Sequence, residues 1–113
     1  MRRLTILMAA FAILALAVPH AGWAQTRYPD KPVRIIVPST PAGVLDNVAR
    51  ALALRLADRL GQPIVIDNKA GAGGNIGTDI VAKSPPDGYT LVLGTVGTHS
   101  INGALYSKMP YDM

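Results

Sequence analysis

The hydrophobic pattern alternates three times between the period of a strand and that of a helix, and this alternation constrains the fold more than any other feature of the sequence. Short runs rich in β-branched and aliphatic residues are typical of buried strands, and apolar spacings of three and four are typical of helices. The expected elements are strands over 33–37, 63–68 and 89–94 and helices over 44–60, 75–83 and a short stretch ending at 105. Such an order is typical of an α/β fold with a parallel sheet, right-handed crossovers and helices on both faces.

The strongest helix signal covers residues 44–60. Asp46 falls in its first turn, where a carboxylate meets unpaired N–H groups and the positive end of the helix dipole. Gly61 follows the last periodic residue, as expected for a helix stop. Arginines occupy one side, and the apolar side expected to face the core consists of Leu45, Val48, Ala49, Leu52, Leu56 and Leu60.

Residues 1–24 have the features of a secretory signal peptide. Two arginines precede the apolar run 4–18, and Gly22 and Ala24 supply the small residues expected before a cleavage site. The run is shorter than the roughly 20 apolar residues that a membrane-spanning helix needs. The chain contains no Cys, which excludes a lipoprotein anchor. We therefore expect export to the periplasm, a mature chain from residue 25 and no stable membrane insertion after cleavage.

Charge and composition exclude several function classes. The 113 residues include 11 Lys and Arg against 7 acidic residues, and the two arginines of the leader account for part of the net charge of +4. The remaining basic residues are scattered, whereas nucleic-acid binding needs a concentrated positive stripe. Without Cys there is no disulfide scaffold and no cysteine metal site, and no His and Asp pair has metal-ligand spacing on a helix. We expect no nucleic acid, metal or cofactor.

In parallel α/β sheets, ligands bind beyond the carboxyl ends of the strands. That edge should carry the loops 39–43, 69–74 and 95–99. The first loop leads into a helix N-terminus, which favours anions, and the third offers hydroxyls beside Gly97. Two such loops could hold one carboxylate. The alternative is that both are ordinary strand-to-helix turns whose glycines and hydroxyls cap helices.

Catalytic and nucleotide-binding patterns are weak. The glycine-rich segment 71–77 resembles a dinucleotide fingerprint, but its last glycine position holds Ile76, so tight turns and close helix–sheet packing explain the glycines better. Asp46 and His99 could approach each other across the strand ends, which leaves a small exported α/β hydrolase as an alternative. No Gly-x-Ser-x-Gly nucleophile elbow accompanies them.

Several motifs together resemble the Bug family, the solute-binding receptors of tripartite tricarboxylate transporters. The resemblance covers residues 28–112, and its motifs are Tyr-Pro-x-Lys-Pro at the start, Leu-Gly-Gln-Pro at 60–63, Gly-Ala-Gly-Gly-Asn-Ile-Gly at 71–77, Pro-Asp-Gly-Tyr-Thr-Leu at 86–91 and Gly-Thr-His at 97–99. It implies a periplasmic receptor, not an enzyme, with two α/β lobes of the type II periplasmic-binding-protein fold that close on a small carboxylate. Residues 25–113 would form the N-terminal part of the first lobe, without the hinge and second lobe, and membrane components of the transporter would be partners.

The resemblance also implies a site in the loops after the first and third strands, where backbone groups, hydroxyls and bridging water hold a carboxylate. The first loop departs from the family pattern Pro-aromatic-x-x-Gly-Gly-x-Thr-Asp, with Ser39 at the aromatic position, Ala42 at the first glycine and Leu45 at the threonine. Family members are also much longer, so a truncated remnant without function is a further alternative. The candidate ligand-binding residues are Ser39, Thr40, Ala42, Gly43, Asp46, Thr95, Gly97, Thr98 and His99.

Overall fold

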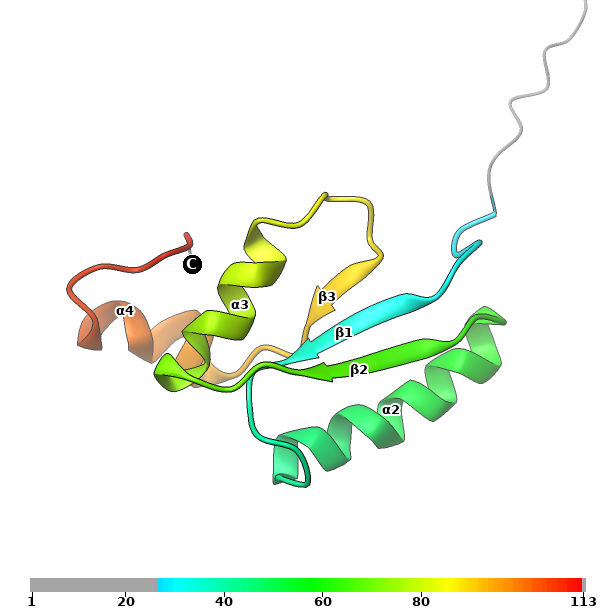
Figure 1. The fold of residues 1–113 in the computed structure, drawn as a ribbon, viewed down its shortest axis with the longest axis horizontal. Coiled ribbons are helices and arrows are strands. Elements are labelled where there is room, and N and C mark those ends of the chain that lie inside the picture. Colours follow the sequence, from blue (N-terminus) through cyan, green and yellow to red (C-terminus); the bar gives the residue numbers. More distant parts are fainter. Residues whose placement is uncertain (1–26, 113) are drawn as a thin grey trace, which may run out of the picture.

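The structure is a computed structural model that describes residues 27–112. The expected signal peptide lies outside these residues. Three parallel strands form one sheet in the order β2-β1-β3 (Figure 1). The strands are β1 (Val33–Val37), β2 (Ile64–Asn68) and β3 (Thr90–Val92). The expected α/β class and parallel sheet are confirmed.

The central strand β1 is hydrogen-bonded on both sides and supplies most of the core. Its Val33, Ile35, Ile36 and Val37 are buried. Both faces of β1 are covered because a helix lies on each side of the sheet, as the alternating pattern predicts. Within β1, Arg34 is the residue that remains partly exposed, and it bonds the carboxylate of Asp67 on β2.

Two helices cover opposite faces of the sheet, each over two of the three strands (Figure 1). The helix α2 (Val44–Leu60) lies against β1 and β2, and it ends at Gly61, whose left-handed φ of 67° satisfies the expected stop. A short 3-10 turn η1 (Ala72–Gly74) leads into α3 (Asn75–Ala82), which packs on β1 and β3. After β3 the chain forms a π turn η2 (Gly97–Ile101) and a short helix α4 (Asn102–Leu105).

The expected inner face of α2 is only partly correct. Ala49 is fully buried and packs with Ile35 and Val37, and Leu45 and Leu56 lie against this cluster. Other members of the predicted apolar side are substantially exposed, because α2 covers only two of the three strands. Within residues 27–112, no further element packs beside one of its flanks. These exposed members are Val48, Leu52 and Leu60.

The third strand is shorter than the expected 89–94. Its regular part spans three residues, although the Leu93 N–H still donates to the Ile36 carbonyl at 2.9 Å, so pairing extends one residue further. The helix expected over 75–83 ends at Ala82. Within the described residues, no helix is long and apolar enough to cross a membrane.

Candidate functional site

The topology places a crevice at the carboxyl ends of β1 and β3. From β1 the chain passes through α2 to β2 on one side, then through α3 to β3 on the other side. Two adjacent strands whose connections diverge in this way form the switch point at which α/β sheets bind ligands. The loops after β1 and β3 flank this point, and both belong to the set of loops expected from the sequence (Figure 1).

The three loops at this edge pack tightly against one another. A Cβ at Gly74, before α3, would lie 2.6 Å from Thr98 Cγ2 and 3.3 Å from Pro38 Cβ. Gly74 also has a φ of 92°, so no other residue fits there without strain. The close approach supports the interpretation that this glycine-rich segment serves packing and turns.

Asp46 holds the first loop. Its buried carboxylate accepts hydrogen bonds from the Ala42 N–H (2.8 Å) and Arg50 Nε (2.9 Å) through one oxygen and from Asn68 Nδ2 (3.0 Å) through the other. The Arg50 hydrogen bond and then the Ala42 amide lower the pKa of Asp46 to about 2. Asn68 also donates to the Ser39 carbonyl at 3.3 Å, so the end of β2 is tied to the loop after β1.

The role of Asp46 differs from the simple helix-cap expectation. It reaches back to an amide before the helix, while the N-cap residue Gly43 has no side chain to cap with. The Ala42 N–H is therefore already bonded to the Asp46 carboxylate and is not free to bind a ligand. No acceptor among residues 27–112 bonds the N–H groups of Val44 or Leu45. These two amides form the free end of α2.

The third loop is organised by Thr98. Its hydroxyl is buried, accepts the Thr95 N–H at 3.0 Å and lies 3.1 Å from the Thr95 carbonyl and 2.7 Å from His99 Nδ1. Thr95 Oγ1 in turn accepts the Thr98 N–H at 3.2 Å. The His99 ring packs over Gly94, where a Cβ would lie 2.5 Å from Cε1. Thr98 is thus a structural residue of the turn, and Thr95 is the more exposed of the two hydroxyls.

A second buried network of hydrogen bonds, which the sequence reasoning missed, ties the loop after β3 to the glycine-rich segment and to the segment after α4. Asn102 Nδ2 donates to the Gly73 carbonyl (3.0 Å) and to Asn75 Oδ1 (2.6 Å). The Tyr111 hydroxyl lies 2.9 Å from the same Asn75 oxygen and 2.6 Å from the Thr98 carbonyl. Asn75 stands in the glycine-rich motif, but spacing alone does not pair it with residues 27 and 36 positions later.

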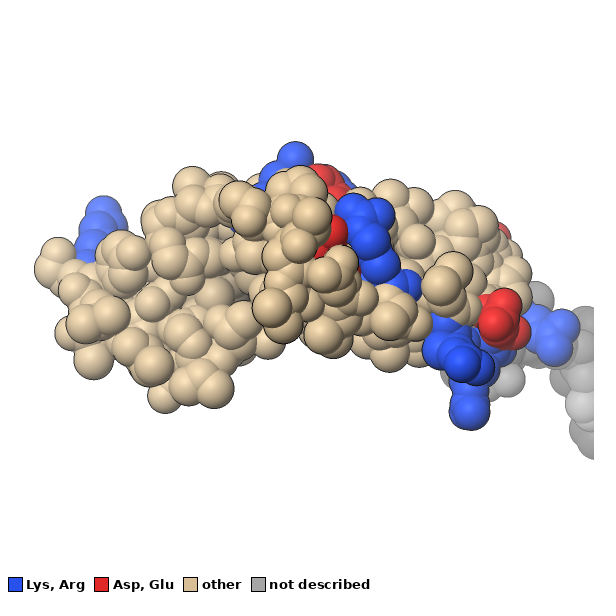
Figure 2. All heavy atoms as spheres, turned by 90° about the horizontal axis from the view of Figure 1, so that it is seen from below, with Lys and Arg blue, Asp and Glu red and all other residues tan. Residues whose placement is uncertain are grey.

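The segment 90–107, which includes the loop after β3, contains no Lys, Arg, Asp or Glu, whereas Lys69 begins the loop after β2. Figure 2 shows charged side chains gathered away from the α4 end, apart from one basic side chain at that tip. Among residues 27–112, Asp46 and His99 share no hydrogen bond, and no group of His, Asp or Glu could hold a metal. The pair suggested for a hydrolase is therefore not assembled.

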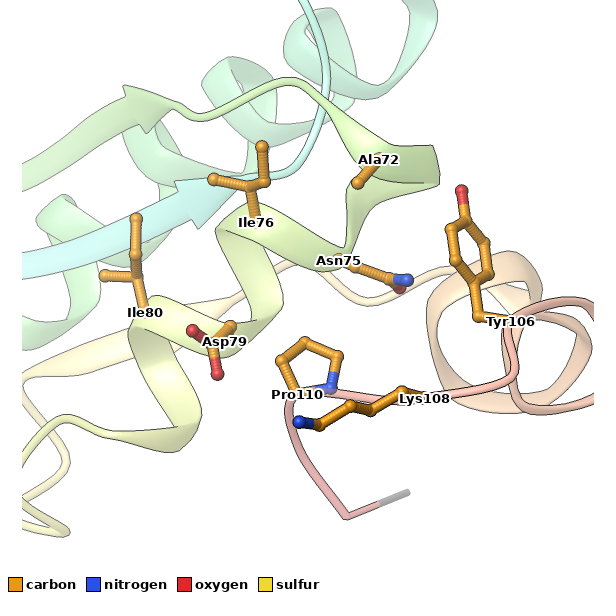
Figure 3. A pocket seen from close by; sticks show the side chains of 8 residues that line it. All are labelled: Ala72, Asn75, Ile76, Asp79, Ile80, Tyr106, Lys108 and Pro110. Carbon is orange, nitrogen blue, oxygen red and sulfur yellow. The ribbon is translucent and has the colours of Figure 1, made fainter.

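A separate pocket of about 410 Å³ lies between α3 and the segment after α4 (Figure 3). Its walls are mainly apolar, with Ile76 and Ile80 on one side and Tyr106 and Pro110 on the other. None of the candidate residues predicted from the sequence lines it. It therefore does not belong to the switch-point site.

The structure is thus an α/β fold with a candidate ligand site at its switch point. Residues 48–113 match the model of the tripartite tricarboxylate transporter family receptor, TctC. The chain belongs to this receptor family, as the motifs predicted. The family consists of solute-binding receptors, which sets the hydrolase alternative aside.

Relatives and solved structures agree with this assignment. BugT of Bordetella pertussis is 46% identical over 107 residues, covering 90% of this chain and 33% of that protein. An R. palustris protein solved with adipate is 46% identical with a TM-score of 0.73, over 75% of this chain and 28% of that one. MatC from Rhodopseudomonas palustris with bound malate is 43% identical with a TM-score of 0.71, over 74% and 29%. The chain thus spans about a third of the length of the curated relatives it matches.

Proposed function

We propose that the chain forms part of a periplasmic receptor that captures a small carboxylate for a tripartite tricarboxylate transporter. The observation that carries this proposal is the pair of free amides at Val44 and Leu45, at the switch point beside β3. An anion is stabilised there by N–H donors and by the helix dipole. The membrane components of the transporter would be the partners of the closed, loaded receptor.

The neutral surroundings favour a carboxylate held by dipoles rather than by an ion pair. Ser39, Thr40 and Thr95 offer hydroxyls on the two loops, and Gly43 and Gly97 allow close approach of the backbone. Asp46 does not contact the ligand in this proposal, because two anions repel at short range. Asp46 and Thr98 hold the loops in place, and Ala42 and His99 contribute through backbone shape and packing.

The solved relatives support this ligand class. Two of them contain adipate and malate, which are small dicarboxylates. Both match about three-quarters of this chain at more than 40% identity. We extend the ligand class, but not the particular ligand, to this protein.

Amide chemical shifts of the isotope-labelled chain, titrated with adipate, test the proposal. Adipate should shift the amides of Val44 and Leu45 first, because these donors are free and lie at the switch point. The Thr95 amide already donates to Thr98 Oγ1 and should respond less. 1,6-Hexanediol has the same chain length without charge and should leave them unchanged. The proposal fails if the diol gives the same shifts, or if adipate acts only on the arginines of α2.

Export is part of the same proposal. Residues 1–24 would direct the chain to the periplasm and be removed after Ala24. Intact-mass measurement of the periplasmic fraction should give a chain that begins at Gln25. A full-length chain recovered from the membrane would contradict this.

A further inference from the structure

The pocket of about 410 Å³ between α3 and the segment after α4 is large enough for a small molecule (Figure 3). Binding sites for small molecules have volumes of about 300–1,000 Å³ and mostly apolar walls. Ile76 and Ile80 line this pocket from α3, and Tyr106 and Pro110 line it from the opposite side. These walls favour a ligand with an apolar body.

Buried contacts hold the two walls of the pocket together. Tyr111 follows Pro110 directly and is buried, and its hydroxyl lies 2.9 Å from Asn75 Oδ1 at the start of α3. Asn75 Nδ2 lies 3.8 Å from Met109 Sδ. The segment that carries Tyr106 and Pro110 is therefore anchored to the helix that carries the opposite wall, so the pocket is a built feature of the fold.

The Asp79 carboxylate lines this pocket with one of its two oxygens unsatisfied. Oδ2 accepts a hydrogen bond from Lys83 Nζ at 2.7 Å. Oδ1 is buried and has no hydrogen-bond partner among residues 27–112. Buried polar atoms in proteins nearly always have a partner, and the last torsion of an aspartate side chain is broad, so this oxygen can turn to meet a donor in the pocket. Asp79 therefore favours a ligand with a positively charged donor group.

Lys108 supplies the opposite charge. Its side chain lines the same pocket and forms no ion pair within the part of the chain that the structure describes. In Figure 3 it extends below Pro110 towards the Asp79 end of the pocket, and Tyr106 lies at the other end. The pocket thus has a hydrogen-bond acceptor and a cation at one end and apolar walls along the rest.

We propose that this pocket binds an apolar amino acid in its zwitterionic form. The ammonium group of the ligand donates to Asp79, and the carboxylate of the ligand pairs with Lys108. The side chain of the ligand lies between Ile76 and Pro110. A plain carboxylate would be repelled by Asp79, and a plain amine would be repelled by Lys108, whereas a zwitterion is attracted to both. No residue of the proposed carboxylate site lines this pocket, so the inference goes beyond the proposed function.

Titration of the isotope-labelled chain with L-leucine tests the proposal. Leucine should shift the methyl resonances of Ile76 and Ile80 and the amides of residues 106–108. 4-Methylpentanoate lacks the ammonium group of leucine, and 3-methylbutylamine lacks its carboxylate. Each should bind this pocket at least about tenfold more weakly, because each loses one charge-assisted interaction. L-Serine keeps the charged groups without the apolar body and should also bind at least about tenfold more weakly.

Substitutions at the charged end of the pocket should weaken leucine binding. Lys108→Gln and Asp79→Asn should each do so by about tenfold. The matched controls are Lys31→Gln and Asp87→Asn, which change an exposed ion pair that does not line the pocket and should leave leucine binding unchanged. Circular dichroism of each variant shows whether it folds. Lys108 is exposed, so Lys108→Gln tests the pocket even if Asp79→Asn fails to fold.

Three results would overturn the proposal. The first is an absence of leucine-dependent shifts at Ile76 and Ile80, including the case in which leucine shifts only Val44 and Leu45 at the switch point. The second is binding of 4-methylpentanoate or 3-methylbutylamine at the pocket as tight as that of leucine. The third is an equal loss of binding in the control variants. Adipate binding is observed at Val44 and Leu45 and leucine binding at Ile76 and Ile80, so failure of one proposal is separate from failure of the other.

Discussion

The hydroxyl of Tyr111 lies 2.6 Å from the backbone carbonyl oxygen of Thr98, 13 residues earlier. Both groups are buried, so the bond ties the segment after α4 to the turn that follows β3. The same hydroxyl lies 2.9 Å from Asn75 Oδ1 and thereby reaches the start of α3. Three segments distant in sequence are joined at one side chain.

Tyr111→Phe removes this hydroxyl and little else. The free energy of unfolding should fall by about 0.5–1.5 kcal/mol, the usual net worth of a hydrogen bond. Amide hydrogen exchange should also quicken across 97–102, because that turn loses a tie to the segment behind it. Tyr106→Phe is the control, since its hydroxyl has no hydrogen-bond partner among residues 27–112. Equal effects of the two substitutions would contradict the assigned role of Tyr111.

Thr98 should matter for the turn through its hydroxyl rather than through its volume. Thr98→Val keeps the shape but leaves the Thr95 N–H without its buried acceptor, at a cost of about 1–3 kcal/mol. Thr98→Ser keeps the hydroxyl and loses one methyl group near Gly74, at a cost of about 0.8 kcal/mol. Urea unfolding of both variants measures the difference. A more stable Val variant would show that the hydroxyl network contributes nothing.

The sequence predicts most of the fold because hydrophobic periodicity is a local signal. The 17-residue helix α2 and the strand β1 have their expected bounds. The exposure of Val48 and Leu52 could not be predicted, because periodicity identifies the apolar side of a helix but not how many strands that side covers. The close contact between His99 and Gly94, which are separated by four intervening residues after the short β3, also leaves no periodic signal in the sequence.

The candidate site is predictable in position but not in roles. The strand order β2-β1-β3 places two of the three expected loops, those after β1 and β3, at the switch point. The sequence already indicates both loops. Which hydroxyls are free depends on burial, so Thr98 and Thr95 cannot be told apart from the sequence. Asn68 was missed for the same reason, because its contact with Asp46 spans 22 residues.

Ala42 should be less favourable than glycine in the first loop. Its φ is 63°, in the left-handed region that costs an L-residue about 1–2 kcal/mol. The family resemblance has a glycine at this position, which fits this backbone. Ala42→Gly should therefore stabilise the protein by about 1 kcal/mol, after allowance for the greater freedom of glycine in the unfolded chain.

Thermal unfolding monitored by circular dichroism measures this change. The control is Ala51→Gly, at an exposed position within α2, which should lower stability by about 0.5–1 kcal/mol because glycine is a poor helix former. The strain at Ala42 is refuted if both glycine variants lose stability to the same extent.

Asp46 should make the stability of the protein depend on pH at the acid end. Its pKa is about 2 in the folded protein, below the ordinary value of 3.8, because Arg50 and the Ala42 amide bond the ionised carboxylate. A lowered folded pKa gives stability that is present above about pH 4 and is lost as the pH falls towards 2. Asp67, whose pKa is lowered chiefly by the hydrogen bond from Arg34, acts in the same direction.

The melting temperature, followed between pH 2 and pH 5, tests this linkage. Asp46→Asn removes the titrating group. The variant should therefore have a lower melting temperature than the parent at pH 5, and its melting temperature should fall less between pH 5 and pH 2. Asp58→Asn changes an exposed carboxylate on α2 and should keep the acid dependence of the parent protein. If Asp46→Asn retains the full loss of stability between pH 4 and pH 2, the Asp46 carboxylate does not brace the first loop in solution. The Val44 and Leu45 amides would then lose the support on which the proposed carboxylate site depends.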